Sequence, residues 1–212
     1  MNSLKHFLLT PTFFVLIICS FFSANVVAEG EKQAVKEIKE NQEALSTSDT
    51  VVLKTNRGDI VIELAADKAP LSVANFKQYI ESGYYDGTIF HRVIPGFMIQ
   101  GGGFEQNMSK KDTLSSIKNE ADNGLENIVG SIAMARTNDP DSATSQFFIN
   151  VNDNKNLDHK AKNQRGWGYA VFGQVVEGLD VVMAISTQAT SSKGRFRDVP
   201  VDTVIIEKVV FR

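Results

Sequence analysis

From Thr50 to the end of the chain, hydrophobic and polar residues alternate in short runs that are separated by turn-forming residues. An alternation with a period of two over about four to eight residues is typical of half-buried β-strands. The runs at 51–55 and 60–64 predict a hairpin, because the connection between them contains Gly58, which can adopt a positive φ. Further strands are predicted at 89–93, 97–100, 128–135, 146–151, 170–176 and 203–210.

Two segments have the spacing of helices instead. Pro70 lies near the start of one, which runs to about Ser82 and is followed by Gly83, a residue suited to ending the last turn. A second helix is predicted near 179–186. Many short strands with only two helices favour a mainly β fold, an antiparallel barrel or sandwich, and the pattern does not choose between them. The apolar face of the first helix, which should cover a sheet, consists of Val73, Phe76, Tyr79 and Ile80.

The segment 1–28 has the composition of a secretory signal peptide. Lys5 precedes an apolar stretch at 7–24, and short residues ending at Ala28 offer a cleavage site. The alternative is an uncleaved membrane anchor, but Pro11 interrupts the apolar stretch and leaves a remainder that is short for a bilayer span. We therefore predict cleavage after residue 28 and no stable membrane insertion afterwards.

Residues 29–49 are polar and rich in helix formers, with Val35, Ile38 and Leu45 on one face of a possible helix. This stripe is thin, so we interpret the segment as a solvated, partly helical spacer that precedes a domain at 50–212. The alternative is a docking or dimerising helix, which would make the domain an adaptor. Loss of oligomerisation or partner capture on deletion of the segment would favour that alternative.

Composition limits the classes of function. The chain has 212 residues, of which 42% are hydrophobic, and this is enough for one packed domain. Its 22 basic and 25 acidic residues give a net charge of only −3, so no field gathers nucleic acid. Signal cleavage removes Cys19, the only cysteine, and with it any disulfide or thiolate ligand. We expect a monomer without a cofactor.

The sequence gives little support for a metal site, a nucleotide site or a hydrolase active site. His91 and His159 are the only histidines after the signal segment, and they lack the local spacing of metal ligands. The run Gly101–Gly103 lacks the remainder of a phosphate-binding loop, so we interpret it as a tight turn that lets the backbone approach its neighbours. We interpret His91 as a structural, hydrogen-bonded residue, and no serine has the surroundings of a hydrolase nucleophile.

Residues 90–104 carry the most informative chemistry, because they place one arginine, one glutamine and apolar residues beside a glycine-rich run. Strand alternation sends Phe97 to one face and Met98 and Gln100 to the other, so a bend must bring Phe97 and Met98 to one pocket if they share it. Ordinary core packing with an exposed Arg92 is the structural alternative. The mixture suits binding of a peptide.

The run FHRVIPGFMIQGG, which begins at Phe90, closely resembles the signature of the cyclophilins, the peptidyl-prolyl cis-trans isomerases. A second block, GSIAMARTNDPDSATSQFFIN at 130–150, and a third, GYAVFG at 168–173, resemble the next segments of the family in the same order. The resemblance extends from about Val51 to Arg212. It implies a closed eight-stranded antiparallel β-barrel with an α-helix over each open end and a binding groove on the outer surface.

The barrier to rotation about an X-Pro bond is roughly 18–20 kcal/mol, because amide resonance must be broken. An enzyme that weakens this resonance needs an apolar pocket for the ring, anchors for the peptide and a donor to the imide nitrogen, and no metal. The resemblance implies that Arg92 is this donor, and a guanidinium suits the task because it stays charged. It also implies that Phe97, Met98, Phe148 and Leu157 line the pocket, that Gln100 orients Arg92 or binds peptide, that Ala135 and Arg136 form the edge that pairs with the substrate, and that Gln146 lies nearby.

Two positions depart from the best-known eukaryotic cyclophilins. Asn156 replaces a tryptophan and Tyr169, a further substrate-binding candidate, replaces a histidine. Loss of an aromatic wall predicts weak binding of cyclosporin with isomerisation retained, although Trp167 could partly fill the gap. A sub-micromolar dissociation constant for cyclosporin, measured by calorimetry, would contradict this.

The resemblance predicts an isomerase acting on unfolded or flexible proline-containing polypeptides. Tyr169 is similar to bacterial secreted members, which with segment 1–28 predicts a periplasmic enzyme that assists the folding of exported or envelope proteins. A eukaryotic secretory route is the alternative, and Asn107 would then be a glycosylation acceptor. The competing function is a non-catalytic proline-peptide binding module or chaperone adaptor.

Overall fold

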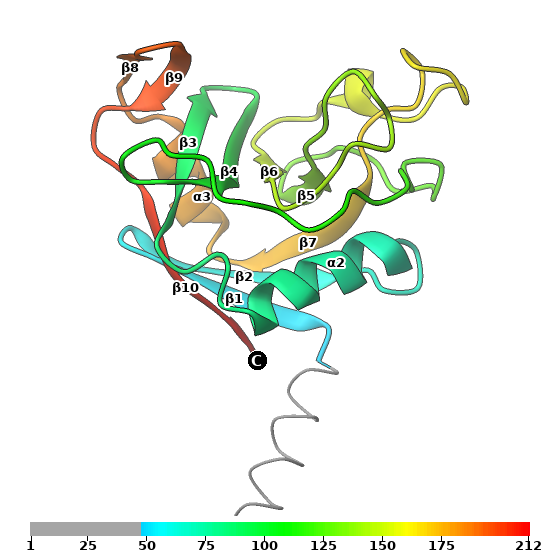
Figure 1. The fold of residues 1–212 in the computed structure, drawn as a ribbon, viewed down its shortest axis with the longest axis horizontal. Helices are drawn as coiled ribbons and strands as arrows, with labels where there is room; N and C mark the ends of the chain where they lie inside the picture. Colours follow the sequence, from blue (N-terminus) through cyan, green and yellow to red (C-terminus); the bar gives the residue numbers. More distant parts are fainter. Residues whose placement is uncertain (1–47) are drawn as a thin grey trace, which may run out of the picture. The chain divides into compact units, whose positions relative to one another are not determined.

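The structure is a computed structural model, and it describes residues 48–212. Eight strands close a barrel in the order β1-β10-β3-β4-β6-β5-β7-β2, and all neighbouring pairs are antiparallel (Figure 1). This confirms the predicted fold and all eight predicted barrel strands. Their bounds are β1 Thr50–Thr55, β2 Gly58–Leu64, β3 Thr88–Ile94, β4 Met98–Glu105, β5 Ser131–Met134, β6 Phe147–Asn150, β7 Val171–Glu177 and β10 Ile205–Phe211.

The strands differ in how far their two faces are buried. β1 alternates as predicted, with Val51 and Leu53 fully buried in the barrel interior. β5 and β6 are buried at every position, and their outward side chains Ala133 and Phe148 belong to a second apolar cluster outside the barrel core. Continuous burial explains why these two strands read as apolar runs rather than as alternations.

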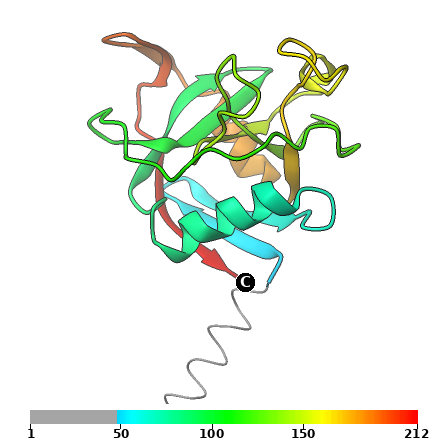
Figure 2. The same ribbon diagram turned by 45° about the vertical axis from the view of Figure 1, so that its right-hand side comes forward.

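Two helices pack against the barrel, α2 (Pro70–Glu81) in front of it and α3 (Leu179–Ser186) behind it in Figures 1 and 2. Phe76 of α2 inserts among aromatic rings of the core, with centroid distances of 5.1 Å to Tyr85, 5.6 Å to Phe147 and 5.2 Å to Phe172. The predicted apolar face of this helix therefore covers the barrel as expected.

The start of α2 depends on a residue from a distant loop. Ala69, at the N-cap, makes no side-chain capping bond. The Glu120 carboxylate accepts hydrogen bonds from the backbone N–H groups of Leu71 at 2.9 Å and Ser72 at 2.8 Å. A carboxylate at a helix N-terminus satisfies free N–H groups and opposes the helix dipole, so tertiary structure supplies the cap that the local sequence lacks.

The prediction of a tight turn at the three glycines is wrong, because Gly101–Gly103 lie within β4, which continues to Glu105. The strand is irregular there: its register against β3 shifts on both sides of Phe90, and Gly102 has a φ of +77°. The expected close approach is present, since a Cβ at Gly102 would lie 2.8 Å from the Phe147 ring. The glycines therefore form a bulged strand rather than a turn.

Three short elements were not predicted. The strands β8 (Thr190–Lys193) and β9 (Phe196–Pro200) form a separate hairpin that lies beside β3 in Figure 1. A 3₁₀ turn, η1, spans Lys155–Leu157. The hairpin is polar and charged, so it carries little of the alternating pattern by which the barrel strands were recognised.

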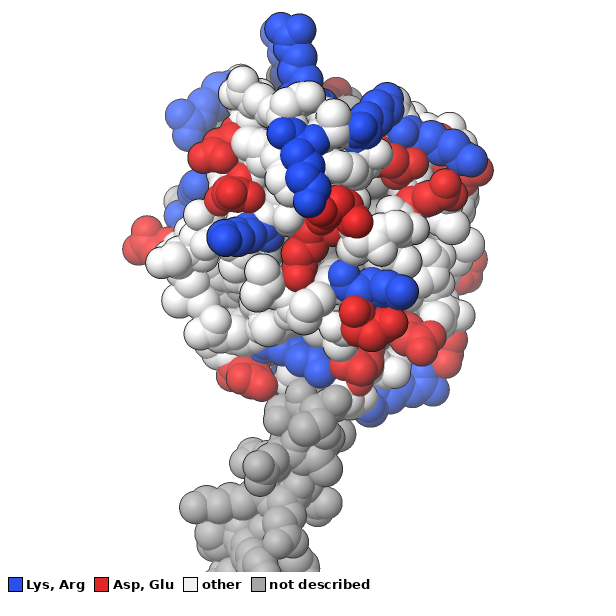
Figure 3. All heavy atoms as spheres, turned by 90° about the vertical axis from the view of Figure 1, so that its right-hand side faces the viewer, with Lys and Arg blue, Asp and Glu red and all other residues white. Residues whose placement is uncertain are grey.

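Nearly all of the signal and spacer predictions lie outside the described residues. Within 48–212, no helix is both long and apolar enough to cross a membrane. On the face drawn in Figure 3, basic and acidic side chains are interspersed. Electrostatic recognition on that face must therefore come from local groups rather than from an extended patch of one sign.

Candidate active site

Three adjacent strands on the outer wall of the barrel bring the predicted site residues together. The register pairs Arg92 of β3 with Gln100 of β4, and Gln100 in turn with Phe148 of β6. The three side chains are separated by up to 56 positions in the chain, but neighbouring strands in a sheet lie only about 5 Å apart. Strand pairing therefore assembles the centre of the site.

An apolar pocket lies beside these polar groups. Met98 and Phe148, with exposed fractions of 2% and 4%, are buried in one cluster, and Phe97, Leu157 and Tyr169 are partly buried against it. The rings of Phe148 and Tyr169 meet edge to face at 5.6 Å. A buried floor with partly exposed walls is a suitable surface for a small apolar ring.

The bend required for this pocket is present. Phe97 lies in the turn before β4, which begins at Met98, so the alternation of a strand does not apply between the two residues. Ile99 points into the barrel core while Phe97 and Met98 join the outer cluster. The pocket therefore depends on the turn ending at Phe97, directly before β4 begins at Met98.

Gln100 does not orient Arg92 through a side-chain hydrogen bond, contrary to one of the two roles expected for it. Its Nε2 donates to Oε1 of Gln146 at 3.0 Å. The two glutamines thus stabilise each other, and Gln146 joins the site through Gln100. The other expected role of Gln100, binding of peptide backbone, stays a prediction.

Arg92 instead pairs with Asp198 of β9, a residue that the sequence analysis missed. Arg92 Nε lies 3.6 Å from Asp198 Oδ2, and the two side chains are 44% and 41% exposed. Asp198 has a φ of +59°, a conformation in which aspartate and asparagine are enriched among residues other than glycine. The only local signal was one acidic residue after the basic run that includes Lys193, Arg195 and Arg197.

We expect the Asp198→Asn variant to have a roughly two- to fivefold lower kcat/KM for X-Pro isomerisation. This loss corresponds to the free energy of one exposed ion pair. Asparagine keeps the size and tolerates the positive φ, so only the charge that restrains Arg92 is lost. Added salt should lower the activity of the wild type but hardly that of the variant.

The matched control is Asp202→Asn, because Asp202 pairs with Arg57 at 3.7 Å, away from the predicted site residues. This control should keep the wild-type activity. Equal activity and equal salt dependence for Asp198→Asn and wild type would show that the ion pair does not position Arg92.

The predicted substrate edge is partly occupied by internal contacts. The Ala135 N–H donates to the Gln146 carbonyl at 2.9 Å, which leaves the Ala135 carbonyl as the group able to pair with a peptide. The Arg136 guanidinium donates through Nε to the Gly168 carbonyl at 2.8 Å and lies 4.7 Å from the centre of the Tyr169 ring. Arg136 therefore holds Tyr169 against the pocket.

Trp167 does not fill the gap left by Asn156. Asn156 is exposed in η1, whereas the Trp167 ring packs on His159 at 5.2 Å and is not a member of the pocket cluster. The expectation that Trp167 compensates for the missing aromatic wall is wrong. Weak cyclosporin binding stays a prediction.

His91, next to Arg92, faces the opposite way and is buried at 6% exposure against the Phe104 ring. Its Nδ1 has no hydrogen-bond partner among residues 48–212, whereas a backbone hydrogen bond with Ile89 acts on the imidazole, in keeping with the expected structural role. Burial, and secondarily the charge of Arg92, lowers the pKa of His91 from 6.5 to about 4. The imidazole is therefore neutral in the folded protein near neutral pH.

We expect acid to destabilise the protein through His91. Between its folded pKa of about 4 and the unfolded value of 6.5, the unfolded chain binds a proton that the folded chain does not. The free energy of unfolding should therefore fall as pH falls through this window, by roughly 3 kcal/mol in total. Urea unfolding at a series of pH values checks this, and the His91→Phe variant should have a flatter profile by that amount; parallel profiles would contradict it.

A closed barrel carries an apolar pocket beside a guanidinium and two paired glutamines, an arrangement suited to holding a peptide. The family model described as cyclophilin type peptidyl-prolyl cis-trans isomerase/CLD matches residues 50–210. The structure is similar to that of a Cryptosporidium parvum cyclophilin-type isomerase solved in the presence of the dipeptide Ala-Pro. The TM-score is 0.63 at 29% identity, and the match covers 77% of this chain and 98% of that one.

Curated bacterial relatives are closer in sequence. The chain is 60% identical over 158 residues to the peptidyl-prolyl cis-trans isomerase cyp18 of Streptomyces antibioticus, which covers 74% of this chain and 95% of that protein. It is 57% identical over 159 residues to peptidyl-prolyl cis-trans isomerase B of Escherichia coli, covering 75% and 97%. The chain belongs to the cyclophilin-type peptidyl-prolyl cis-trans isomerases.

Proposed function

We propose that this isomerase acts in the periplasm on exported or envelope proteins whose folding is limited by X-Pro rotation. The observation that carries the proposal is the N-terminal segment 1–28, with Lys5, an apolar stretch and short residues before Ala28. Uncatalysed X-Pro isomerisation takes tens of seconds or longer, which makes it a rate-limiting step for folding. An exported isomerase meets such chains as they arrive unfolded.

In the proposed mechanism the proline ring enters the pocket whose floor is Met98 and Phe148. Arg92 donates an N–H to the imide nitrogen, which gains a lone pair as the bond twists and resonance is lost. The donor interacts more strongly with the twisted state than with either planar isomer, and this difference lowers the barrier. The Ala135 carbonyl and the side chain of Gln100 hold the peptide on either side of the proline.

Cell fractionation and mass spectrometry test the location. The full chain with a C-terminal epitope tag should appear in the periplasmic fraction of a Gram-negative host, with Glu29 as its first residue. An uncleaved protein in the membrane fraction would support the anchor alternative, and a cytoplasmic protein that begins at Met1 would contradict export. Lys5→Glu, which reverses the positive flank, should reduce export.

Refolding kinetics test the role. Residues 29–212 should accelerate the slow, proline-limited phase of an exported protein and leave its fast phases unchanged. The Arg92→Ala variant is the control for acceleration by binding alone. If both proteins accelerate the slow phase equally, the effect is not catalysis by this site.

A further inference from the structure

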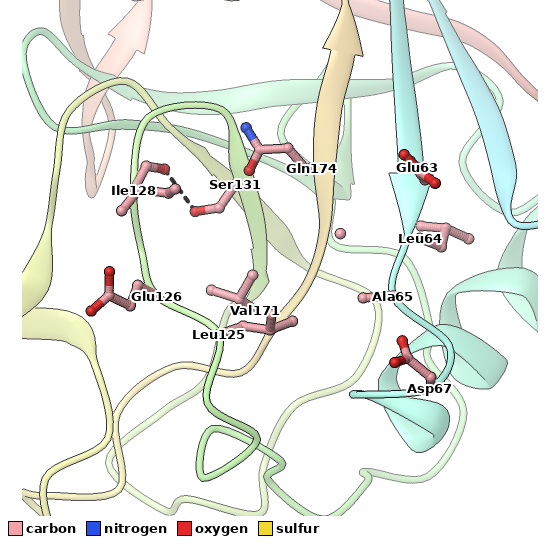
Figure 4. Close-up of a pocket in the computed structure, with 11 residues that line it drawn as sticks. Glu63, Leu64, Ala65, Asp67, Leu125, Glu126, Ile128, Ser131, Val171 and Gln174 are labelled. Atoms are coloured by element: carbon pink, nitrogen blue, oxygen red, sulfur yellow. Dashed lines mark hydrogen bonds between the residues drawn. The ribbon is translucent and has the colours of Figure 1, made fainter.

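A hollow of about 310 Å³ lies on the outer wall beside the proline site, and none of the residues assigned to the proline groove line it. Its volume is at the lower end of the range of small-ligand sites. Figure 4 shows residues of β7 between the end of β2 on one side and the segment around Glu126 on the other. The hollow is lined by Glu63, Leu64, Ala65, Asp67, Leu125, Glu126, Ile128, Ser131, Val171, Gly173 and Gln174.

Apolar side chains form much of this hollow. Leu64 and Val171 are buried, whereas Ile128 is 39% exposed and offers apolar surface at the rim. The two neutral polar side chains of the lining each donate within the protein: Ser131 Oγ donates to the Ile128 carbonyl at 2.8 Å and Gln174 Nε2 to the Val129 carbonyl at 3.0 Å. Apolar side chains and charged groups therefore make up much of the surface left for a ligand.

Those charged groups are all acidic. Glu63 and Asp67 lie on the β2 side of the hollow and Glu126 on the opposite side (Figure 4). None of the three carboxylates makes an ion pair or side-chain hydrogen bond with another residue of 48–212, and no lysine or arginine lines the hollow. Among the same residues no cluster of His, Cys, Asp and Glu is suited to a metal ion. Carboxylates on opposite sides of an apolar surface suit a cation whose charged head is carried on an apolar chain.

We propose that this hollow binds a lysine or arginine side chain of a client polypeptide, flanked by an apolar residue. The methylene groups of the cation would lie on Val171 and Ile128, and the charged head would reach the carboxylates at the rim. Lysine and arginine bury their stems on apolar surface in this way while their heads stay hydrated. The flanking apolar residue covers the exposed part of Ile128.

The hollow borders the proline site through shared side chains. Val171 is buried in the apolar cluster that contains Met98 and Phe148, and Leu125 packs against it, while both also line the hollow. A client bound there is therefore held next to the isomerase pocket. Such an anchor raises the local concentration of nearby prolines without taking part in bond rotation. The inference does not depend on the compartment in which the enzyme works.

A titration of ¹⁵N-labelled residues 29–212 with proline-free capped peptides tests the site. The peptide Leu-Lys-Leu should produce saturable shifts of the amides of Leu125, Ile128 and Gln174 but not of Arg92 or Gln100. The neutral peptide Leu-Gln-Leu should bind much more weakly. Saturable shifts confined to the proline groove, or no saturable shifts, would overturn the proposal.

Charge-neutral variants make the test specific. Glu63→Gln combined with Glu126→Gln should weaken binding of Leu-Lys-Leu by about tenfold, the effect of two surface ion pairs. The Asp202→Asn control should bind normally, and all these variants should keep wild-type isomerisation of a short X-Pro peptide. Unchanged affinity in the double variant, or equal binding of spermidine without an apolar contribution, would exclude a site for basic client side chains.

Discussion

Replacement of Arg92 by alanine is expected to lower kcat/KM for X-Pro isomerisation by roughly 100- to 1,000-fold, as for removal of a donor aimed at developing charge. The guanidinium is the only cationic group among the predicted site residues that is not bound to backbone carbonyls, because Arg136 donates to Gly168 and Thr137. NMR exchange between the cis and trans forms of a short X-Pro peptide measures the rate directly.

The fold of the Arg92→Ala variant should be unchanged. The Arg92 side chain is 44% exposed and makes one ion pair on the surface, so its removal should change the free energy of unfolding by less than about 1 kcal/mol. Arg92→Lys, which keeps the charge but loses the planar donor geometry, should recover only a small part of the activity. A folded Arg92→Ala variant with wild-type activity would remove Arg92 from the mechanism. A wild type that binds the peptide without accelerating exchange would favour the binding-module alternative.

The second large effect is expected from Gly102→Ala, which should lower the free energy of unfolding by about 3 kcal/mol. Gly102 has a φ of +77°, which strains any residue with a Cβ. A Cβ there would also lie 2.8 Å from the Phe147 ring and 2.9 Å from the Tyr85 ring, both of which are fully buried. Urea unfolding of the variant measures the loss.

Gly96→Ala separates the two causes. Gly96 has a similar φ of +69°, but a Cβ there would meet nothing within 4 Å. The Gly96→Ala substitution should therefore lower the free energy of unfolding only by the backbone strain, about 1 kcal/mol. Equal losses in the two variants would show that the rings around Gly102 move aside and that close packing is not the reason for the glycine.

The glycine run also connects the core to the catalytic surface. A Cβ at Gly103 would clash with Cγ of Gln146, the residue that accepts the hydrogen bond from Gln100. A Cβ at Gly101 would lie 3.0 Å from the Phe90 ring in the barrel core. The space above the glycines is thus filled by core rings on one side and by a site residue on the other.

Local pattern identified the barrel strands because most of them have apolar residues with a strand period, while β5 and β6 are short apolar runs. The segments at 51–55 and 60–64 are correct almost to the residue. The hairpin of β8 and β9 was missed because Thr190–Lys193 is polar and exposed. The three glycines suggested a turn, because a sequence does not show that Phe147 and Tyr85 occupy the space above them.

The family resemblance named the residues of the pocket, but not all of their contacts. Phe97, Met98, Phe148, Leu157 and Tyr169 meet in one cluster, and their role in binding proline stays a prediction. The pairing of Gln100 with Gln146 rather than with Arg92 depends on the distance between side chains on β4 and just before β6, which is 3.0 Å from Gln100 Nε2 to Gln146 Oε1. Such distances follow from strand register and bulges, which short motifs do not specify.

By itself, the sequence determined the mainly β class, the positions of eight strands and two helices, and the membership of a family of prolyl isomerases, since these depend on local periodicity and on ordered motifs. Only the tertiary structure decided that Asp198 contacts Arg92, that Glu120 caps α2 and that three carboxylates surround an apolar hollow. Each of these contacts joins residues far apart in the chain, or side chains whose directions are set by packing. Closure of the barrel brings them within reach, and no local pattern encodes that closure.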